Sequence, residues 1–459
     1  MPGQFETHQR KKMRLMLPCI LIGIGVLLWL LIGAYYMWKY FLPPEPQLQA
    51  QPSTVPSGTV ATQPTQPPII KQSTATIGAT GDLLLHDKVI KSGYNSETGT
   101  YNFESIFSFF APYVSQLDYA VANLEVTLCG EDNGYKYSGY PCFNAPDAIV
   151  DAAKAAGFDM LLTANNHCFD TGTKGFFRTQ QVVTDRGLDY IGTRDAVEKK
   201  NYTVKEINGI RIGMICYTYN TGFDENGKVS LNGISLTQEA SALVNSFNYK
   251  NLDGFYEKLS GELAVMRADG AEAVMLYIHW GDEYQIQANS TQKKMAQELC
   301  DLGIDVIVGN HAHVPQPVEL LTNTKDASKK TLCLYSTGNA ISNIRVGPSY
   351  PPESEDGMLF TVTFAKYSDG TVIVESADIL PTWVNRYFEN GKTEFKILTM
   401  DPLCENQWRE NMGLTHDMLK VIQDSYARTM KIVGQGLETA NAYYGENQKQ
   451  VEKSLKIAE

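Results

Sequence analysis

The chain has 459 residues, of which 43% are hydrophobic and 10% aromatic, and its formal net charge is -12 at pH 7. This composition suits a chain that buries a core over most of its length. The acidic balance argues against a groove for nucleic acid, because such a groove needs an excess of lysine and arginine. An anionic polymer would likewise need metal ions or a local basic patch to be bound.

The N-terminal part is predicted to anchor the chain in a membrane. Residues 15–38 carry no charge, and the run is long enough for a helix to cross a hydrocarbon core of about 30 Å. Four basic residues precede it in the arm 1–14, and aromatic residues cluster between 35 and 41. This order is typical of a single-pass span with a cytoplasmic N-terminus and an extracellular main domain at the cell membrane. A cleaved signal peptide is the alternative, but its apolar run is shorter.

Residues 39–73 are rich in Pro, Gln, Thr and Ser and poor in bulky apolar residues, so they are predicted to form an extended linker. A folded domain is expected over 74–385. A C-terminal helical extension is expected over 386–459, because 408–458 has the periodicity of amphipathic helices.

Apolar runs bounded by Gly, Asn and Asp predict the strands of the domain. They cover 76–81, 119–124, 160–163, 212–217, 273–279, 305–308 and 332–335. Helix-period stretches fall between several of them, at 103–116, 146–156, 174–186 and 292–302. This alternation indicates an α/β domain. Alternating segments on either side of Asp369 and Gly370 predict a β-hairpin at a sheet edge.

Seven of the eight cysteines lie beyond the predicted span. Cys129 and Cys142 flank a polar loop that a disulfide could close in an oxidising compartment. The sequence leaves this pairing open, since spacing does not determine connectivity.

Candidate functional side chains gather where predicted strands end, which is where open α/β sheets bind ligands. Five of the seven histidines lie in or beside these places: His86, His167, His279, His311 and His313. His311 and His313 would project to one side of an extended segment. Since imidazole and carboxylate together suit Mn, Fe or Zn, we predict a divalent-metal site, with two metal ions as the sharper hypothesis.

Six motifs follow one another along the chain: GDLLLH, ANLEVTL, LTANNHCFDTG, YIHWGDEY, VGNHAHVPQPVE and LYSTGNAIS. In this order they resemble the CapA family, which is associated with poly-γ-glutamate capsule synthesis. The resemblance covers residues 74–381. It implies a metallophosphoesterase-like sandwich of two sheets flanked by helices, with the transmembrane helix and the helical tail outside it.

The resemblance also implies a ligand set for two metal ions. Asp82 would be a terminal ligand of the first ion, Glu125 the acid that bridges both, and Asn166 an amide ligand of the second. The remaining ligands would be the imidazoles of His279, His311 and His313.

Catalytic and substrate-binding roles follow in the same way. His167 would be the acid or the donor to the transition state, because an imidazole can give or hold a proton near neutral pH. Asp170 would orient its ring or bond the local turn. Asn339, Trp280 and Glu283 would contact the substrate, although an aromatic residue at a strand end more often belongs to the core.

Two positions depart from the metallophosphoesterase pattern, while both are similar to the CapA pattern. The superfamily usually has His two residues after its first Asp, where this chain has Leu84. His86 follows two residues later and stays outside the expected ligand set. Glu125 stands where the superfamily usually has Asp. These departures bear on phosphoesterase activity more than on the family.

We therefore expect a membrane-anchored extracellular component of capsule or cell-envelope polymer synthesis or export, with a dinuclear, hydrolase-like metal site. Its expected partners are subunits of a polymer synthase or exporter, and its expected substrate is an anionic or cell-envelope polymer. Two alternatives stay open: a scaffold without catalysis, and an extracellular metal-dependent phosphoesterase.

Overall fold

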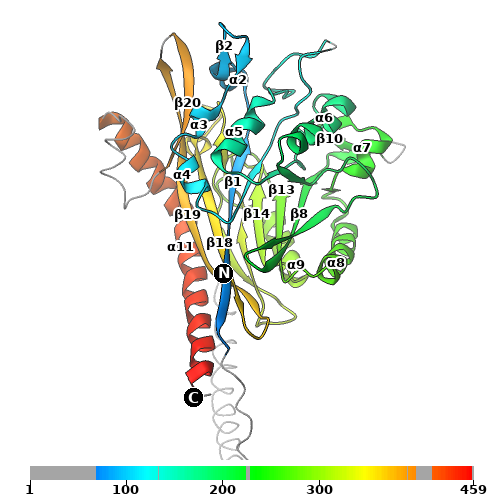
Figure 1. Ribbon diagram of the computed structural model, residues 1–459, viewed down its shortest axis with the longest axis vertical. Helices are drawn as coiled ribbons and strands as arrows, with labels where there is room; N and C mark the ends of the chain where they lie inside the picture. Colours follow the sequence, from blue (N-terminus) through cyan, green and yellow to red (C-terminus); the bar gives the residue numbers. More distant parts are fainter. Residues whose placement is uncertain (1–68, 133, 224–227, 390, 400–415, 457–459) are drawn as a thin grey trace, which may run out of the picture. The chain divides into compact units, whose positions relative to one another are not determined.

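The computed structural model describes residues 69–132, 134–223, 228–389, 391–399 and 416–456 (Figure 1). The predicted arm 1–14, the predicted span 15–38 and residues 39–68 of the predicted linker lie outside them. Within the described ranges, no helix combines the length and apolar character that crossing a membrane requires.

The first large sheet contains eight strands. In spatial order they are β20 (Lys392–Thr399), β19 (Val372–Glu389), β18 (Asp356–Tyr367), β1 (Lys71–Leu83), β4 (Tyr119–Asn123), β5 (Met160–Leu162) and β6 (Asp189–Ile191), with β17 (Asn339–Ile341) paired to β1. Strands β1, β4, β5 and β6 are parallel, whereas β18, β19 and β20 add antiparallel neighbours.

The second large sheet contains seven strands. In spatial order they are β12 (Ser246–Phe247), β8 (Ile210–Tyr219), β13 (Ala273–His279), β14 (Val306–Asn310), β16 (Lys330–Leu334) and β15 (Val318–Thr322), with β7 (Tyr202–Ile207) paired to β8. The five strands from β12 to β16 in this order are parallel. All seven strands predicted from the sequence are present in the two sheets.

Alternation along the strands makes the two sheets pack face to face. In β13, Ala273, Met275 and Tyr277 join residues of β1 and β4 in one core between the sheets. Because successive side chains of a strand point to opposite faces, Val274, Leu276 and Ile278 lie on the other face. Helices α8 (Leu252–Ala268) and α9 (Ser290–Asp301) cover that face.

The outer face of the first sheet is also covered by helices. These include α2 (Asp87–Gly93), α3 (Glu104–Phe107), α4 (Ala111–Val114), α5 (Ala148–Ala156) and α6 (Gly172–Asp185). The mixed α/β class is therefore confirmed. The single helix predicted over 103–116 is wrong: it is divided into α3 and α4, because Pro112 supplies no backbone N–H and suits the first turn of a new helix.

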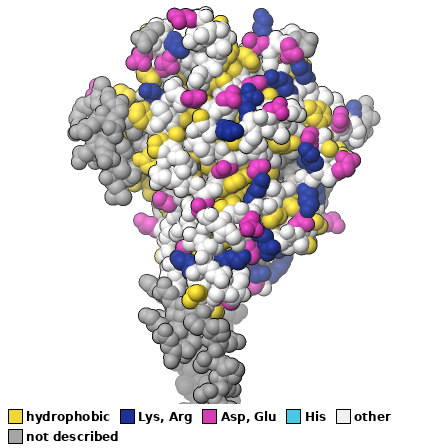
Figure 2. Space-filling view, in the orientation of Figure 1, with side chains coloured by type: hydrophobic (Ala, Val, Ile, Leu, Met, Phe, Trp, Pro, Cys, Tyr) yellow, Lys and Arg dark blue, Asp and Glu magenta, His cyan; other side chains and the backbone are white. Residues whose placement is uncertain are grey.

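The C-terminal part differs from the prediction of a purely helical extension. The expected boundary at 385 falls inside β19, and β20 then forms the sheet edge that we expected the β18–β19 hairpin to close. Helix α11 (His416–Lys456) packs along β19 and β15 (Figure 1). Its apolar residues, including Val433 and Leu437, complete the core between the sheets. Acidic and basic side chains are interspersed over the face shown in Figure 2.

Candidate metal centre

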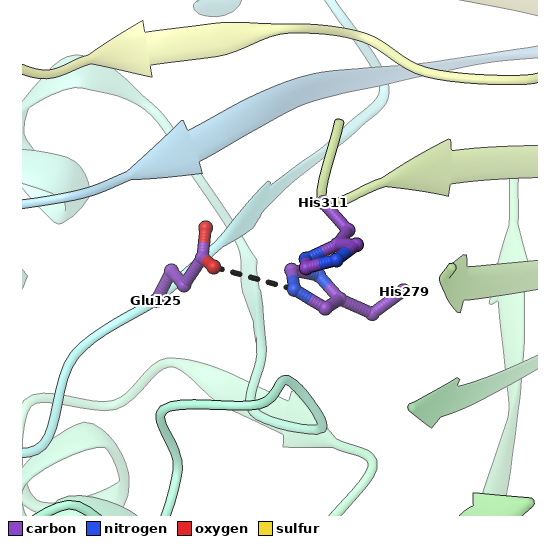
Figure 3. Close-up of side chains that lie close together, drawn as sticks. All are labelled: Glu125, His279 and His311. Carbon is purple, nitrogen blue, oxygen red and sulfur yellow. Dashed lines mark ion pairs between the residues drawn. The ribbon is translucent and has the colours of Figure 1, made fainter. Parts of the chain in front are cut away.

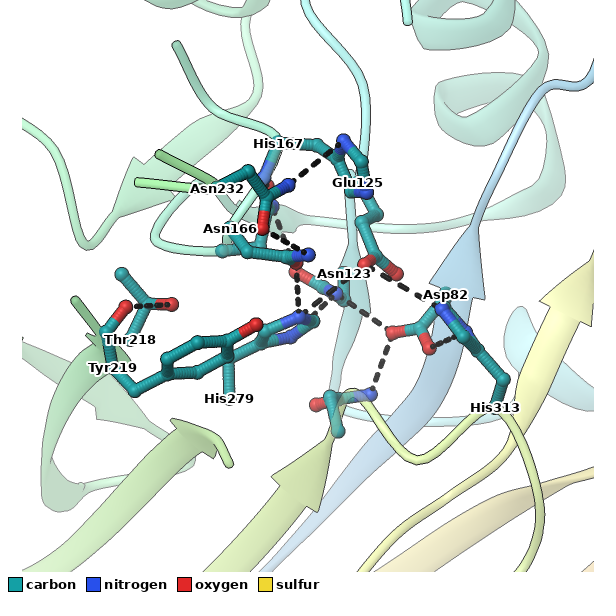
Figure 4. Close-up of polar contacts among 12 residues, drawn as sticks. Asp82, Asn123, Glu125, Asn166, His167, Thr218, Tyr219, Asn232, His279 and His313 are labelled. Carbon is teal, nitrogen blue, oxygen red and sulfur yellow. Dashed lines mark hydrogen bonds and ion pairs between the residues drawn. The ribbon is translucent and has the colours of Figure 1, made fainter. Parts of the chain in front are cut away.

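The parallel strands bring their polar ends together at one edge of the sandwich (Figure 4). Asn123, the last residue of β4, donates from Nδ2 to Oδ1 of Asp82 at 2.7 Å. Asn310, the last residue of β14, donates to the same oxygen at 3.2 Å. Nδ2 of Asn123 also lies 3.5 Å from Nδ1 of His279, the last residue of β13. The two sheets therefore share one polar edge.

The first potential ligand group joins Asp82, Glu125 and His313, whose ligand atoms all lie within 4.8 Å of one another. Nδ1 of His313 lies 3.1 Å from Oδ2 of Asp82 and 3.0 Å from Oδ1 of Asn339. Nε2 of His313 lies 3.9 Å from Oε1 of Glu125. All three side chains of the group are buried.

The second group joins Glu125, His279 and His311 (Figure 3). Nε2 of His279 lies 3.3 Å from Oε1 of Glu125, and the rings of His279 and His311 have centroids 4.8 Å apart. Oδ1 of Asn166 lies 2.7 Å from Nε2 of His279, which adds an amide oxygen to this group. Glu125 is thus a member of both groups.

Glu125 provides the test of whether a metal fits. Both of its carboxylate oxygens are buried without a hydrogen-bond partner, and Nδ1 of His311 also lacks one. An unpaired buried carboxylate costs several kcal/mol, so a bound cation would remove a large penalty. Carboxylate and imidazole ligands together fit a first-row divalent ion.

The electrostatics keep the imidazoles of His279 and His311 in the form that binds metals. Burial lowers the pKa of His279 to about 3, and burial with the nearby imidazoles lowers the pKa of His311 well below its usual value. Both rings are therefore neutral at pH 7, as a metal ligand must be. Burial and then the neighbouring Asp82 carboxylate raise the pKa of Glu125 well above its usual value.

Asp82 and His313 behave as a pair. Burial opposes the charged form of each, but the hydrogen bond and the attraction between them outweigh it. The pKa of Asp82 is therefore lowered and the pKa of His313 is raised.

The backbone after β14 is strained where it presents the two histidines. His311 has φ 92° and His313 has φ 56°, in the left-handed region that costs residues with a side chain about 1–3 kcal/mol each. The extended segment assumed from the sequence is therefore wrong, because the strand ends at Asn310. Gly309 is required just before, since a Cβ there would lie 1.9 Å from the carbonyl oxygen of Tyr335.

His167 and Asp170 make the expected contact. Nδ1 of His167 lies 2.7 Å from Oδ2 of Asp170, which also accepts a hydrogen bond from the backbone N–H of Phe143 at 2.7 Å. The ring of Phe143 packs edge-on against His167, with centroids 4.8 Å apart. With Nδ1 engaged by Asp170, Nε2 is the ring nitrogen that can serve a substrate.

Two expected substrate contacts are wrong. The fully buried Trp280 stacks on Tyr335 and donates from Nε1 to its carbonyl oxygen at 3.0 Å, since it points to the opposite face from His279. Asn339 is also fully buried, and its Nδ2 donates to the carbonyl oxygens of His313 and Ser354. Asn339 therefore holds His313 in place instead of lining a pocket.

Other predicted positions lie as follows. Glu283 is exposed, and its charge acts on Glu125 and His313, so it lies near the site. Leu84 is buried in the apolar core. Nδ1 of His86 lies 3.3 Å from the carbonyl oxygen of Leu84, and His86 belongs to neither ligand group, as expected.

Sequence reasoning missed two residues of the site. The ring of Tyr219, at the end of β8, has its centroid 4.9 Å from that of His311, and the strand-end rule applied to β8 would have found it. Asn232 contacts Asn166 and His167 from a hairpin turn. An Asn-Gly pair indicates that turn, but no local pattern shows what the turn contacts.

The loop after β4 is closed without the disulfide considered from the sequence. Cys129 is a buried free thiol and Cys142 an exposed one. Hydrogen bonds from the side chain of Asn144 close the loop instead. Its Oδ1 accepts from the N–H of Cys129, and its Nδ2 donates to the carbonyl oxygens of Gly130 and Lys136.

Comparison with known proteins gives one family match and several relatives. A family model described as "Bacterial capsule synthesis protein PGA_cap" matches residues 76–344. The capsule biosynthesis protein CapA of Bacillus anthracis is 28% identical over 271 residues, which are 58% of this chain and 59% of that protein. The PGA biosynthesis protein CapA of Bacillus subtilis is 26% identical over 240 residues, which are 52% of this chain and 57% of that protein.

The matched region thus spans less than two thirds of the length of these two relatives. Among solved structures, a Staphylococcus aureus protein assigned as a 5′-nucleotidase, in complex with alpha-ketoglutarate, is 14% identical with a TM-score of 0.39. That match covers 77% of this chain and 58% of that protein.

Proposed function

Since the chain belongs to the PGA_cap family of bacterial capsule synthesis proteins, we propose that it acts in the synthesis or export of a capsule or cell-envelope polymer. Poly-γ-glutamate is the proposed polymer. Support comes from the relatives in two Bacillus species, whose names refer to capsule biosynthesis and PGA biosynthesis.

We propose that the polar edge of the sandwich holds two divalent ions, Mn, Fe or Zn, and works as a hydrolase-like centre. The observation that carries this proposal is the position of Glu125, which is a member of both ligand groups and has two buried oxygens without a hydrogen-bond partner. A carboxylate that bridges two cations needs this arrangement. Divalent ions supply Lewis-acid chemistry there, because they polarise a substrate oxygen and stabilise developing negative charge.

The residues around the ligands have separate roles in this proposal. Asp82, Asn166 and the histidines bind the ions. Asp170 accepts a hydrogen bond from Nδ1 of His167 and fixes the ring orientation. Nε2 of His167 then gives a proton to the leaving group or stabilises charge on the substrate, as general acid–base catalysis requires.

The cellular setting is a further part of the proposal and rests on residues 1–73 alone. A span over 15–38 would anchor the chain in the cell membrane, and the linker would hold the domain outside. Synthase or exporter subunits in the membrane are the proposed partners. An anionic or cell-envelope polymer is the proposed substrate.

Metal analysis of the full-length chain, purified in detergent, tests the centre. The wild type is expected to hold two divalent ions per chain, and His311→Ala at most one, because a ligand of the second group is lost. His86→Ala is the matched control, since His86 lies beside the site but belongs to neither group. Two ions retained by His311→Ala would refute the assigned ligands.

His167→Ala separates catalysis from a scaffold role in a strain that makes the polymer. Because His167 is not an assigned ligand, this variant is expected to keep both ions and to lose surface polymer. Normal surface polymer in a His167→Ala strain would favour the scaffold instead.

A further inference from the structure

A small hairpin delivers one more side chain to the site. Strand β10 (Val229–Leu231) pairs with β11 (Ile234–Ser235) on one side and with β9 (Gly222–Phe223) on the other, in a separate three-stranded sheet. Asn232 and Gly233 form the turn between β10 and β11, with φ 48° and 75°. Two consecutive left-handed residues are typical of a two-residue hairpin turn, for which Asn-Gly is a preferred pair.

The turn is held firmly from both sides. The N–H of Gly233 donates to Oγ1 of Thr221 at 3.1 Å. Leu231, directly before the turn, is buried in a cluster that contains Cys168 and Phe169. These two residues directly follow His167 in the sequence. The hairpin tip is therefore fixed against the loop that carries Asn166 and His167.

The side chain of Asn232 reaches both residues of that loop (Figure 4). Its Oδ1 accepts a hydrogen bond from Nδ2 of Asn166 at 3.2 Å, and its Nδ2 lies 3.5 Å from Nδ1 of His167. On the other side of the amide, Oδ1 of Asn166 lies 2.7 Å from Nε2 of His279. Asn232 thus contacts the end of Asn166 that faces away from the ligand group.

The contact matters because the two ends of an amide have nearly the same shape but opposite chemistry. Only the oxygen of an amide can bind a cation, whereas the NH2 group is a donor. An acceptor placed against Nδ2 therefore selects the orientation in which Oδ1 faces His279 of the second ligand group. Partners behind a metal ligand commonly control its orientation in this way.

We propose that Asn232 is a positioning residue for the second ligand group and selectively strengthens binding of the ion held by Glu125, His279 and His311. This inference rests on the proposed two-metal function. It gives the β10–β11 hairpin a specific role, which is to hold the amide of Asn166 with its oxygen toward the ion.

Three variants of the full-length chain, with wild type, test this inference by Mn²⁺ titration calorimetry. Asn232→Gly removes the acceptor but tolerates the left-handed backbone. Asn232→Asp keeps an acceptor oxygen and is the conservative variant. Asn208→Gly is the matched control, because Asn208 also occupies an Asn-Gly turn, with φ 49°, and its Nδ2 donates to the carbonyl oxygen of Thr74.

Wild type is expected to bind two Mn²⁺ ions. Asn232→Gly should bind the second ion about 10- to 100-fold more weakly, the usual loss when a partner behind a ligand is removed, and the first with unchanged affinity. Asn232→Asp should recover most of the second affinity, and Asn208→Gly should match wild type. The electron paramagnetic resonance signal of coupled Mn²⁺ pairs should weaken only in Asn232→Gly.

The two proposals fail in different ways. A wild type that binds fewer than two ions overturns the two-metal function and this inference with it. Two ions in wild type with unchanged second affinity in Asn232→Gly overturns the inference alone. An equal loss of affinity for both ions in Asn232→Gly also overturns it, and so does a loss that Asn232→Asp does not recover. In either case the hairpin would support the whole metal-binding edge and would not orient Asn166 specifically.

Discussion

Two buried carboxylates, Glu125 and Asp356, have opposite surroundings within one fold. Asp356, at the start of β18, accepts hydrogen bonds from Arg428 at 2.8 and 3.0 Å and from the hydroxyl of Ser425, both on α11. Glu125 has no hydrogen-bond partner for either oxygen. The comparison teaches that a buried charge does not by itself mark a functional site. A missing internal partner is the more informative feature.

The largest effect is expected at the paired carboxylate. Asp356→Ala leaves the guanidinium of Arg428 without its partner, and breaking a buried ion pair costs about 3 kcal/mol of the free energy of unfolding. Urea unfolding of the metal-free chain measures this cost. Glu125→Gln is the contrasting variant: it removes an unpaired carboxylate and should leave the metal-free stability unchanged or higher. Equal destabilisation by both variants would break the comparison.

Added metal should stabilise only the variants that keep Glu125. Mn²⁺ at about 100 times its dissociation constant should raise the free energy of unfolding of the wild type by about 2.7 kcal/mol. Asp356→Asn should gain the same amount, because its site is intact, and Glu125→Gln should gain none. Thermal unfolding with and without Mn²⁺ gives the measurement. A Glu125→Gln variant stabilised as much as wild type would show that Glu125 is not a ligand.

A smaller difference between the two carboxylates is expected in how Mn²⁺ affinity depends on pH. Burial raises the pKa of Asp356 to about 6, although Arg428 bonds its ionised form, so Asp356 is already ionised at pH 7. The pKa of Glu125 is raised well above its usual value, so at any pH below that raised pKa a metal must displace its proton. Below that pKa, Mn²⁺ affinity should rise by up to tenfold per pH unit, about 1.4 kcal/mol.

Calorimetric Mn²⁺ titrations at a series of pH values around neutrality check this slope. Asp356→Asn should keep it. A flat profile in the wild type would mean that Glu125 carries no proton in the metal-free fold.

The resemblance and the elements of the fold could be predicted because they depend on local patterns. The six ordered motifs pointed to CapA, and the family match confirms that family. The strand 273–279 is confirmed to the residue as β13, since its apolar run is bounded by polar residues on both sides. Asp82 and His313 lie at or just after the ends of predicted strands, and the structure brings their side chains within 3.1 Å of each other.

What failed depended on contacts between distant segments. The sequence shows that Trp280 follows a strand, but only the packed helices determine which face it points to. Asn339 looked like a pocket residue because its two partners, one of them His313, lie 15 or more residues away along the chain. The left-handed φ of His311 and the close packing of Gly309 on Tyr335 two residues earlier are features that no spacing rule contains.

Strand β1 also separates the start of the first sheet from the metal-binding edge. It begins at Lys71, whose Nζ pairs with the carboxylate of Glu375. Gln448, near the end of α11, donates to the backbone carbonyl oxygen of Glu375. From Lys71 to Asp82 the strand covers about 36 Å at about 3.3 Å per residue. The start of the strand and the ligands of the centre therefore lie at opposite ends of one rigid element of the sheet.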